Sequence, residues 1–137
     1  MSPLITILRP GRVGPTTCSG RKIVLSGDTR PCQTTEVYAH EAELLVHEAT
    51  FLADERARAR DTGHSTAAEA AELARDAGVK LLALTHLSTR YFPRDVRDEA
   101  RAVFPATLVP RDFDTIEVPF PERGEPHLVK EDTPAPT

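Results

Sequence analysis

Three side chains able to bind metal or transfer protons stand where a buried strand would end or a helix would begin. Asp28 follows the apolar run in "KIVLSGD", and His86 follows the apolar run in "LLALTH". His64 lies in "GHST", directly before an alanine-rich helical pattern. Carboxylate and imidazole are zinc ligands, and an imidazole can also act as a general acid or meet an anion at a helix N-terminus. These residue types predict a metal-assisted or acid–base site if the fold brings them together.

Each of these residues also has an ordinary structural explanation. An aspartate in a turn often caps backbone N–H groups, and a histidine after a strand is often a packing residue. We expect His40 to lie on the surface of a helix and His127 to be solvated. The segments "HEAEL" and "HEATF" begin like the zinc-protease motif H-E-x-x-H but lack its second histidine, which excludes a single-helix zinc site.

Alternating strand and helix patterns would position the candidate side chains. The chain reads as strands at 23–25, 43–46 and "VKLLALTH", helices at 34–40, 51–60 and 94–104, and short strands in "ATLVP" and "DTIEVP". The segment "STAAEAAELARDAG" predicts a helix with a capping box between Thr66 and Glu69 and an end at Gly78. The alternation is typical of α/β layers, which place sites beyond the carboxyl ends of their strands. We therefore expect Asp28 and His86 to converge on one sheet edge.

Composition and charge restrict the class of protein. With 137 residues, 39% of them hydrophobic, the chain can form one modest domain, and no apolar run approaches the roughly 20 residues that span a bilayer. A net charge of −4 argues against binding nucleic acid by bulk positive charge. The N-terminus has no signal-peptide pattern, so we expect a cytoplasmic protein without a membrane partner.

The two cysteines and the C-terminal residues do not suggest a catalytic or metal-binding role. Cys18 and Cys32 form no C-x-x-C motif, and we expect two free thiols. Prolines accumulate and hydrophobic residues thin out towards the C-terminus. This change predicts a folded unit over 1–118 and a disordered tail over 119–137.

Four motifs in order resemble a known family. They are "SGDTRP", "HEATF", "GHST" and "LTHLS", and they are similar to the C-terminal half of ribonuclease Z, the zinc endonuclease that matures tRNA 3′ ends. That family belongs to the metallo-β-lactamase superfamily. The resemblance covers about residues 20–118. It implies an α/β fold that is half of a metallo-β-lactamase-like αββα sandwich, with one mixed sheet and helices on one face.

The resemblance also implies a role for each site residue. Asp28 would be the carboxylate that bridges two zinc ions, and His86 a histidine ligand of one of them. His64 would act on the scissile phosphate with support from Glu48, whereas His47 of the same motif is interpreted as a strand-end residue. Two zinc ions can lower the pKa of a bridging water and stabilise an in-line displacement. The implied reaction is zinc-dependent cleavage of the 3′ trailer of tRNA precursors, with a tRNA precursor as partner.

The main metal motif of that family, H-x-H-x-D-H, is absent from these 137 residues, and no histidine precedes His40. Two protein ligands are too few for a zinc pair, because even one catalytic zinc usually has three. We therefore expect the chain to require a missing N-terminal half or a second polypeptide. The resemblance also implies a homodimer. A half-sandwich alone is expected to expose the inner face of its sheet as an apolar patch.

Other interpretations of the sequence remain open at this point. The chain could be a truncated remnant or association module without catalysis, or another hydrolase of the metallo-β-lactamase fold that acts on a small phosphodiester. Arg90, Arg94 and Arg97 could contact phosphates, although a solvated helix face explains the helical arginines equally well.

Overall fold

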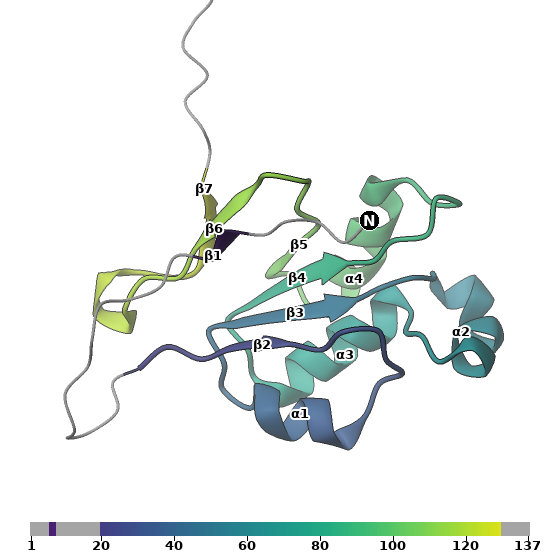
Figure 1. Cartoon of the computed structure of the whole chain (residues 1–137), viewed down its shortest axis with the longest axis horizontal. Coiled ribbons are helices and arrows are strands. Elements are labelled where there is room, and N and C mark those ends of the chain that lie inside the picture. The colour runs from purple at the N-terminus through teal and green to yellow at the C-terminus, as the bar shows by residue number, and fades with distance from the viewer. Residues whose placement is uncertain (1–5, 8–19, 130–137) are drawn as a thin grey trace, which may run out of the picture.

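A four-stranded parallel sheet forms the centre of the molecule (Figure 1). The computed structural model describes residues 6–7 and 20–129. The strand order is β2-β3-β4-β5, with β2 at Ile23–Leu25, β3 at Leu44–Glu48, β4 at Leu81–Thr85 and β5 at Thr107–Leu108. All neighbouring pairs are parallel, so the carboxyl ends of the strands meet at one edge. The runs "LLV" and "LLAL" are apolar without alternation because β3 and β4 are covered on both faces.

Helices cover one face of this sheet. They are α1 at Gln33–Ala39, α3 at Ala67–Ala77 and α4 at Pro93–Val103. Small alanine side chains on α3 let it pack closely on Leu45, Leu82 and Leu84 of the central strands. A 3-10 turn at Ala53–Glu55 leads into α2 at Arg56–Thr62, which lies beyond the edge where the strands end (Figure 1).

The boundaries of α3 follow from its sequence. The Thr66 hydroxyl accepts from the backbone N–H of Glu69, and the Glu69 carboxylate accepts from the backbone N–H of Thr66. This reciprocal pair satisfies two of the unpaired N–H groups at the helix start. At the other end, Gly78 adopts a left-handed φ of 69°, which allows the chain to turn after the last helical residue. The predicted capping box and helix end are both confirmed.

A second, three-stranded sheet covers the opposite face of the central sheet. It contains β1 at Thr6–Ile7, β6 at Thr115–Glu117 and β7 at His127–Val129. Ile116 and Val118 are buried against inner-face side chains of β3 and β4, namely Leu44, Val46, Leu81 and Ala83. The prediction that this inner face is exposed is therefore wrong at β3 and β4, whereas Leu25 of β2, the register partner of Val46, is 64% exposed.

The arrangement differs from the sequence prediction in two further ways. The central sheet is parallel where a mixed sheet is predicted, and mixed pairing occurs in the small sheet, where β6 pairs parallel to β1 and antiparallel to β7. The sequence also predicts a disordered tail from residue 119, whereas a 3-10 turn at Pro121–Arg123 and strand β7 lie there.

Residues 130–137 and Cys18 lie outside the described residues, and Cys32 is a free, exposed thiol. In the described ranges, no helix is long and apolar enough to cross a bilayer.

Candidate active and metal site

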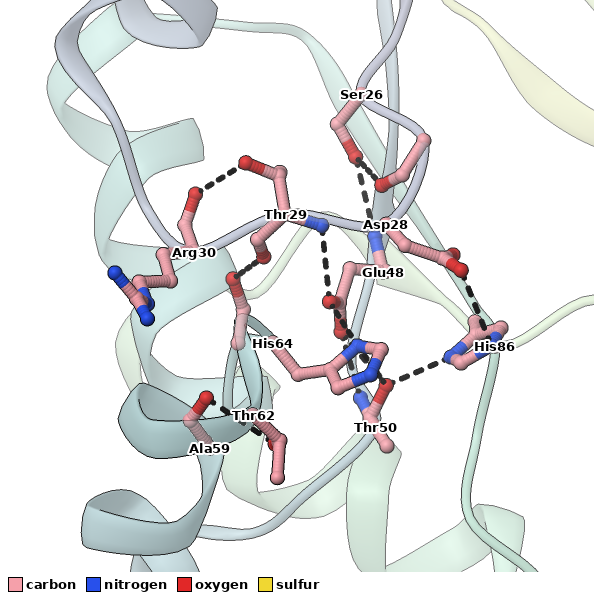
Figure 2. Close-up of polar contacts among 12 residues, drawn as sticks. Ser26, Asp28, Thr29, Arg30, Glu48, Thr50, Ala59, Thr62, His64 and His86 are labelled. Carbon is pink, nitrogen blue, oxygen red and sulfur yellow. Dashed lines mark hydrogen bonds and ion pairs between the residues drawn. The ribbon is translucent and has the colours of Figure 1, made fainter.

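The ends of three parallel strands deliver the side chains of the site. After β2, the Ser26 N–H still donates to the Val46 carbonyl at 2.9 Å, and Gly27 then turns the chain with a left-handed φ of 64°. This turn places Asp28 just beyond the edge. Glu48 is the last residue of β3, and His86 directly follows β4. Figure 2 shows the Asp28 and His86 side chains pointing towards one another, with Glu48 beside them.

His64 reaches the same edge from the connection between α2 and α3. Gly63 ends α2 in a left-handed conformation, with φ of 77°, and the His64 N–H donates to the Ala59 carbonyl at 2.8 Å. The next residue, Ser65, donates its hydroxyl to the Thr29 carbonyl at 2.6 Å. The loop that carries His64 is therefore tied directly to the loop that carries Asp28.

The Glu48 carboxylate holds this arrangement together. Its side chain is 1% exposed. Oε1 lies 3.1 Å from the Thr29 N–H nitrogen and 2.8 Å from His64 Nδ1, while Oε2 accepts from the Thr50 N–H at 3.0 Å and the Thr50 hydroxyl at 2.9 Å. A carboxylate offers about four lone-pair sites, and protein groups occupy all four here. Glu48 therefore orients its neighbours and has no lone pair left for a metal, although its oxygen lies within 4.8 Å of ligand atoms of His64 and His86.

The donor pattern fixes which nitrogen of His64 is free. Since Glu48 can only accept when ionised, His64 donates through Nδ1–H. The Nδ1 atom also lies 3.2 Å from the Thr50 hydroxyl. The Nε2 atom of His64 is consequently the one available to a ligand or substrate, and its side chain is 22% exposed.

Thr50 links this pair to His86. Its hydroxyl proton goes to Glu48, so Oγ1 accepts from His86 Nδ1 at 2.7 Å. This tautomer leaves a lone pair on His86 Nε2, which lies 3.5 Å from Asp28 Oδ2. Two acceptors facing one another require a proton or a metal cation between them. An imidazole nitrogen and a carboxylate oxygen are ligands that zinc takes, so this donor pair fits zinc.

Backbone strain and exposure distinguish His86 from a packing residue. It adopts a left-handed φ of 56°, a conformation that costs a non-glycine residue about 1–2 kcal/mol. Its ring stacks on that of His64, with centroids 5.2 Å apart and an angle of 15° between the planes. The side chains of His86 and Asp28 are 40% and 60% exposed, so solvent reaches the gap between them.

The remaining histidines take no part in this cluster. His47 is fully buried within β3, and its Nδ1–H donates to the Glu48 carbonyl at 2.8 Å. Burial holds the pKa of His47 below its ordinary value of 6.5. His40 is exposed at the end of α1, and His127 is exposed in β7. These positions agree with their interpretation as structural or solvated residues.

The structure thus brings Asp28, Glu48, His64 and His86 to one sheet edge, as the sequence predicts. Sequence reasoning missed Thr50, whose hydroxyl contacts three of them. Thr50 could have been found from its position in "HEATF", because it lies two residues after Glu48, on the loop that follows the same strand.

An α/β unit with acidic and imidazole side chains at the ends of parallel strands has the architecture of a metallo-β-lactamase half-domain. The family model for the beta-lactamase superfamily domain matches residues 15–87. The chain belongs to this superfamily.

Curated relatives at high identity are ribonuclease Z proteins. That of Gemmatimonas aurantiaca is 56% identical over 105 residues, which are 75% of this chain and 33% of the relative. That of Methanothermobacter thermautotrophicus is 51% identical over 113 residues, 82% of this chain and 37% of the relative. The chain thus spans about a third of the length of these relatives, and its resemblance to ribonuclease Z is confirmed.

Solved structures show the same fold. The metallo-β-lactamase fold protein YhfI from Bacillus subtilis matches with a TM-score of 0.61 and 25% identity, over 82% of this chain and 42% of that one. Human tRNase Z, short form, matches with a TM-score of 0.53 and 32% identity, over 69% of this chain and 32% of that one. The predicted fold class, half of a metallo-β-lactamase-like α/β sandwich, is confirmed.

Proposed function

We propose that this chain supplies the C-terminal part of a ribonuclease Z-like, zinc-dependent phosphodiesterase that cleaves the 3′ trailer of tRNA precursors. The observation that carries the proposal is the convergence of Asp28, His86, His64 and Glu48 at the strand ends. The names of the relatives support the choice of substrate class, since they are ribonuclease Z and tRNase Z.

Asp28 and His86 would hold zinc in this enzyme, each as a metal ligand. The ions would supply Lewis acidity and an activated water for attack on phosphorus. Thr50 fixes His86 with Nε2 turned towards Asp28, and such outer hydrogen bonds orient metal-binding histidines.

His64 and Glu48 would act on the phosphodiester itself. The Glu48 carboxylate accepts from Nδ1 of His64 and so aims Nε2 at the substrate side. A protonated Nε2 can donate to the ribose oxygen as its bond to phosphorus breaks, or to a non-bridging oxygen as negative charge develops there. The negatively charged Glu48 keeps the ring in this orientation through the reaction.

Completion of the site requires further ligands. The described residues place two metal-binding side chains together, whereas a catalytic zinc usually has three protein ligands. We propose that an N-terminal half, on this or another polypeptide, provides the rest, and that the completed enzyme is a cytoplasmic homodimer.

A fusion tests this function. The N-terminal part of the Gemmatimonas aurantiaca relative, up to the region matched at 56% identity, is joined to this chain. The purified fusion is expected to bind zinc and to release the 3′ trailer from a tRNA precursor, while the chain alone releases none. Asp28→Ala and His64→Ala should each abolish release.

Matched controls keep the fusion test informative. His40→Ala removes an exposed histidine outside the site and should leave cleavage unchanged. A fusion that unfolds cooperatively and binds zinc but leaves the precursor intact would refute the proposal and favour a non-catalytic module. Cleavage that survives His64→Ala would refute the assigned role of His64.

A further inference from the structure

A groove opens directly beside the candidate site. It has a volume of about 790 Å³, within the range of ligand-binding pockets, and His86 lies in its wall. The start of α4 contributes a second part of the wall, and the segment that follows β5 contributes a third, including Val109 and Arg111. A ligand in this groove would therefore be continuous with a substrate at His86.

The charge of the groove is positive although the chain is acidic. Three arginines line it, Arg94, Arg97 and Arg111, against one acidic residue, Asp112. Arg94 and Arg97 are three residues apart on α4 and so share one face of the helix. Within residues 20–129, the acidic partner of each is the carboxylate of its next neighbour, at 3.4 Å and 2.9 Å respectively, and such pairings are weak at an exposed surface. An arriving phosphate could replace them.

An aromatic side chain completes the groove. Phe92 lies in its wall at the start of α4 and is 70% exposed, so the ring is not part of a core. Exposed aromatic rings beside cationic side chains are the pattern that binds single-stranded nucleic acid, because bases stack on the ring while arginines contact phosphates. Arg90, which precedes Phe92 in the chain, contacts Glu55 at 3.2 Å and is not in the groove wall.

We infer that this groove binds unpaired nucleotides of an RNA substrate next to the scissile phosphate, with one base stacked on Phe92 and the backbone held by Arg94 and Arg97. The inference rests on the proposed function for the identity of the nucleic acid. Its proposed nucleotide contacts, Phe92, Arg94 and Arg97, are distinct from the acid–base and metal residues, although His86 lies in the same wall. It also explains how an acidic chain could hold an anionic substrate through local charge.

Fluorescence anisotropy on the full chain tests the inference without any need for cleavage. The probe is a short, labelled single-stranded RNA, titrated at low and at physiological salt. Phe92→Ala should weaken binding about 5- to 150-fold, the range for loss of one stacked base. Arg97→Gln should reduce the slope of log affinity against log salt by about 0.7, the value for one phosphate contact on a single strand.

Two control variants match these changes. Tyr38→Ala removes an equally exposed aromatic ring, 68% exposed, from α1. Arg75→Gln removes an exposed arginine of α3 that contacts its next neighbour, Asp76, at 3.0 Å, as Arg97 contacts Asp98. Both variants should bind the probe as the unaltered chain does.

The outcomes separate this inference from the proposed function. If Phe92→Ala and Arg97→Gln weaken RNA binding while the two control variants do not, the groove is supported as the RNA-binding site, even if the fusion enzyme proves inactive. Equal binding of a duplex of the same length, together with an unaffected Phe92→Ala variant, overturns it even if the fusion cleaves tRNA precursors. Absence of any binding by the unaltered chain at low salt overturns it as well.

Discussion

At the scale of single residues, the Thr50 hydroxyl connects the two histidines of the site. It donates to the Glu48 carboxylate and accepts from His86, so it determines the tautomer of the ring that faces Asp28. A buried hydroxyl with such partners is costly to remove when the partners stay behind, because their polar atoms lose hydrogen bonds. The role of Thr50 is therefore one of positioning.

Replacement of Thr50 by valine tests this role. Thr50→Val keeps the shape and removes the hydroxyl, so we expect a loss of about 1–3 kcal/mol in the free energy of unfolding, measured by urea denaturation. In the fusion enzyme, zinc affinity should fall about 10- to 100-fold, as is typical when an outer hydrogen bond to a metal-binding histidine is removed. Thr50→Ser keeps the hydroxyl and should retain most of both quantities. A Thr50→Val variant that keeps both quantities unchanged would contradict the positioning role.

His47 gives the stability a pH dependence. Its ring is buried and neutral, and burial places its pKa in the folded chain below the ordinary 6.5. As the pH falls through 6.5, the unfolded chain binds the proton first, so stability is full at neutral pH and declines towards the lower folded pKa. The melting temperature should therefore fall between neutral pH and about pH 5. His47→Asn, which retains a donor for the Glu48 carbonyl, should flatten this decline. A decline of the same steepness in His47→Asn would exclude His47 as its source.

The sequence predicts some of these residues and not others for a physical reason. Asp28 and His86 end apolar runs, and the ends of parallel strands meet, so their convergence follows from local patterns. The contacts of Thr50 depend on the direction of the loop after β3, and no local sequence pattern predicts that direction. The left-handed backbone of His86 is likewise visible only in the structure.

At the scale of elements, local chemistry decides how well a boundary can be predicted. The α3 helix has its start signal, its stop signal and its buried alanines within one continuous segment, so its limits are readable from the sequence. Strands β1 and β7 have two and three residues, too few for an alternating pattern to emerge. They are strands because β6 offers hydrogen-bonding partners on both sides.

The N-cap of α3 also supports the site, because Thr66 lies two residues after His64. Thr66→Ala removes the acceptor of the Glu69 N–H and should cost about 1 kcal/mol of unfolding free energy. Thr66→Ser preserves the cap and should cost less, with both measured by urea denaturation. In the fusion enzyme, Thr66→Ala should also reduce cleavage if the cap holds the loop that carries His64. A serine variant as unstable as the alanine variant would show that packing of the methyl group dominates.

At the scale of the whole molecule, the two faces of the central sheet are covered in different ways. Three helices pack on one face, and the small sheet packs its Ile116 and Val118 on the other. A sequence that resembles half of a sandwich predicts an uncovered inner face, because that reasoning assigns the cover to the missing half. Since β6 and β7 lie about 90 residues or more after β2 in the chain, their return onto the sheet is a long-range contact that local patterns do not reveal.

The packing of the small sheet on the central sheet predicts how a substitution at Ile116 changes the stability of this chain. Ile116 is fully buried between the two sheets, so Ile116→Ala should leave a cavity and cost about 2–5 kcal/mol of unfolding free energy. Leu25→Ala shortens a leucine that is 64% exposed and should change stability by no more than about 0.5 kcal/mol. Chemical denaturation of both variants, followed by circular dichroism, measures the difference. If the two variants lose equally little, the small sheet does not cover the inner face in solution, and that face is then available to a partner half. A large loss in Ile116→Ala alone instead supports the small sheet as the cover of the inner face at β3 and β4.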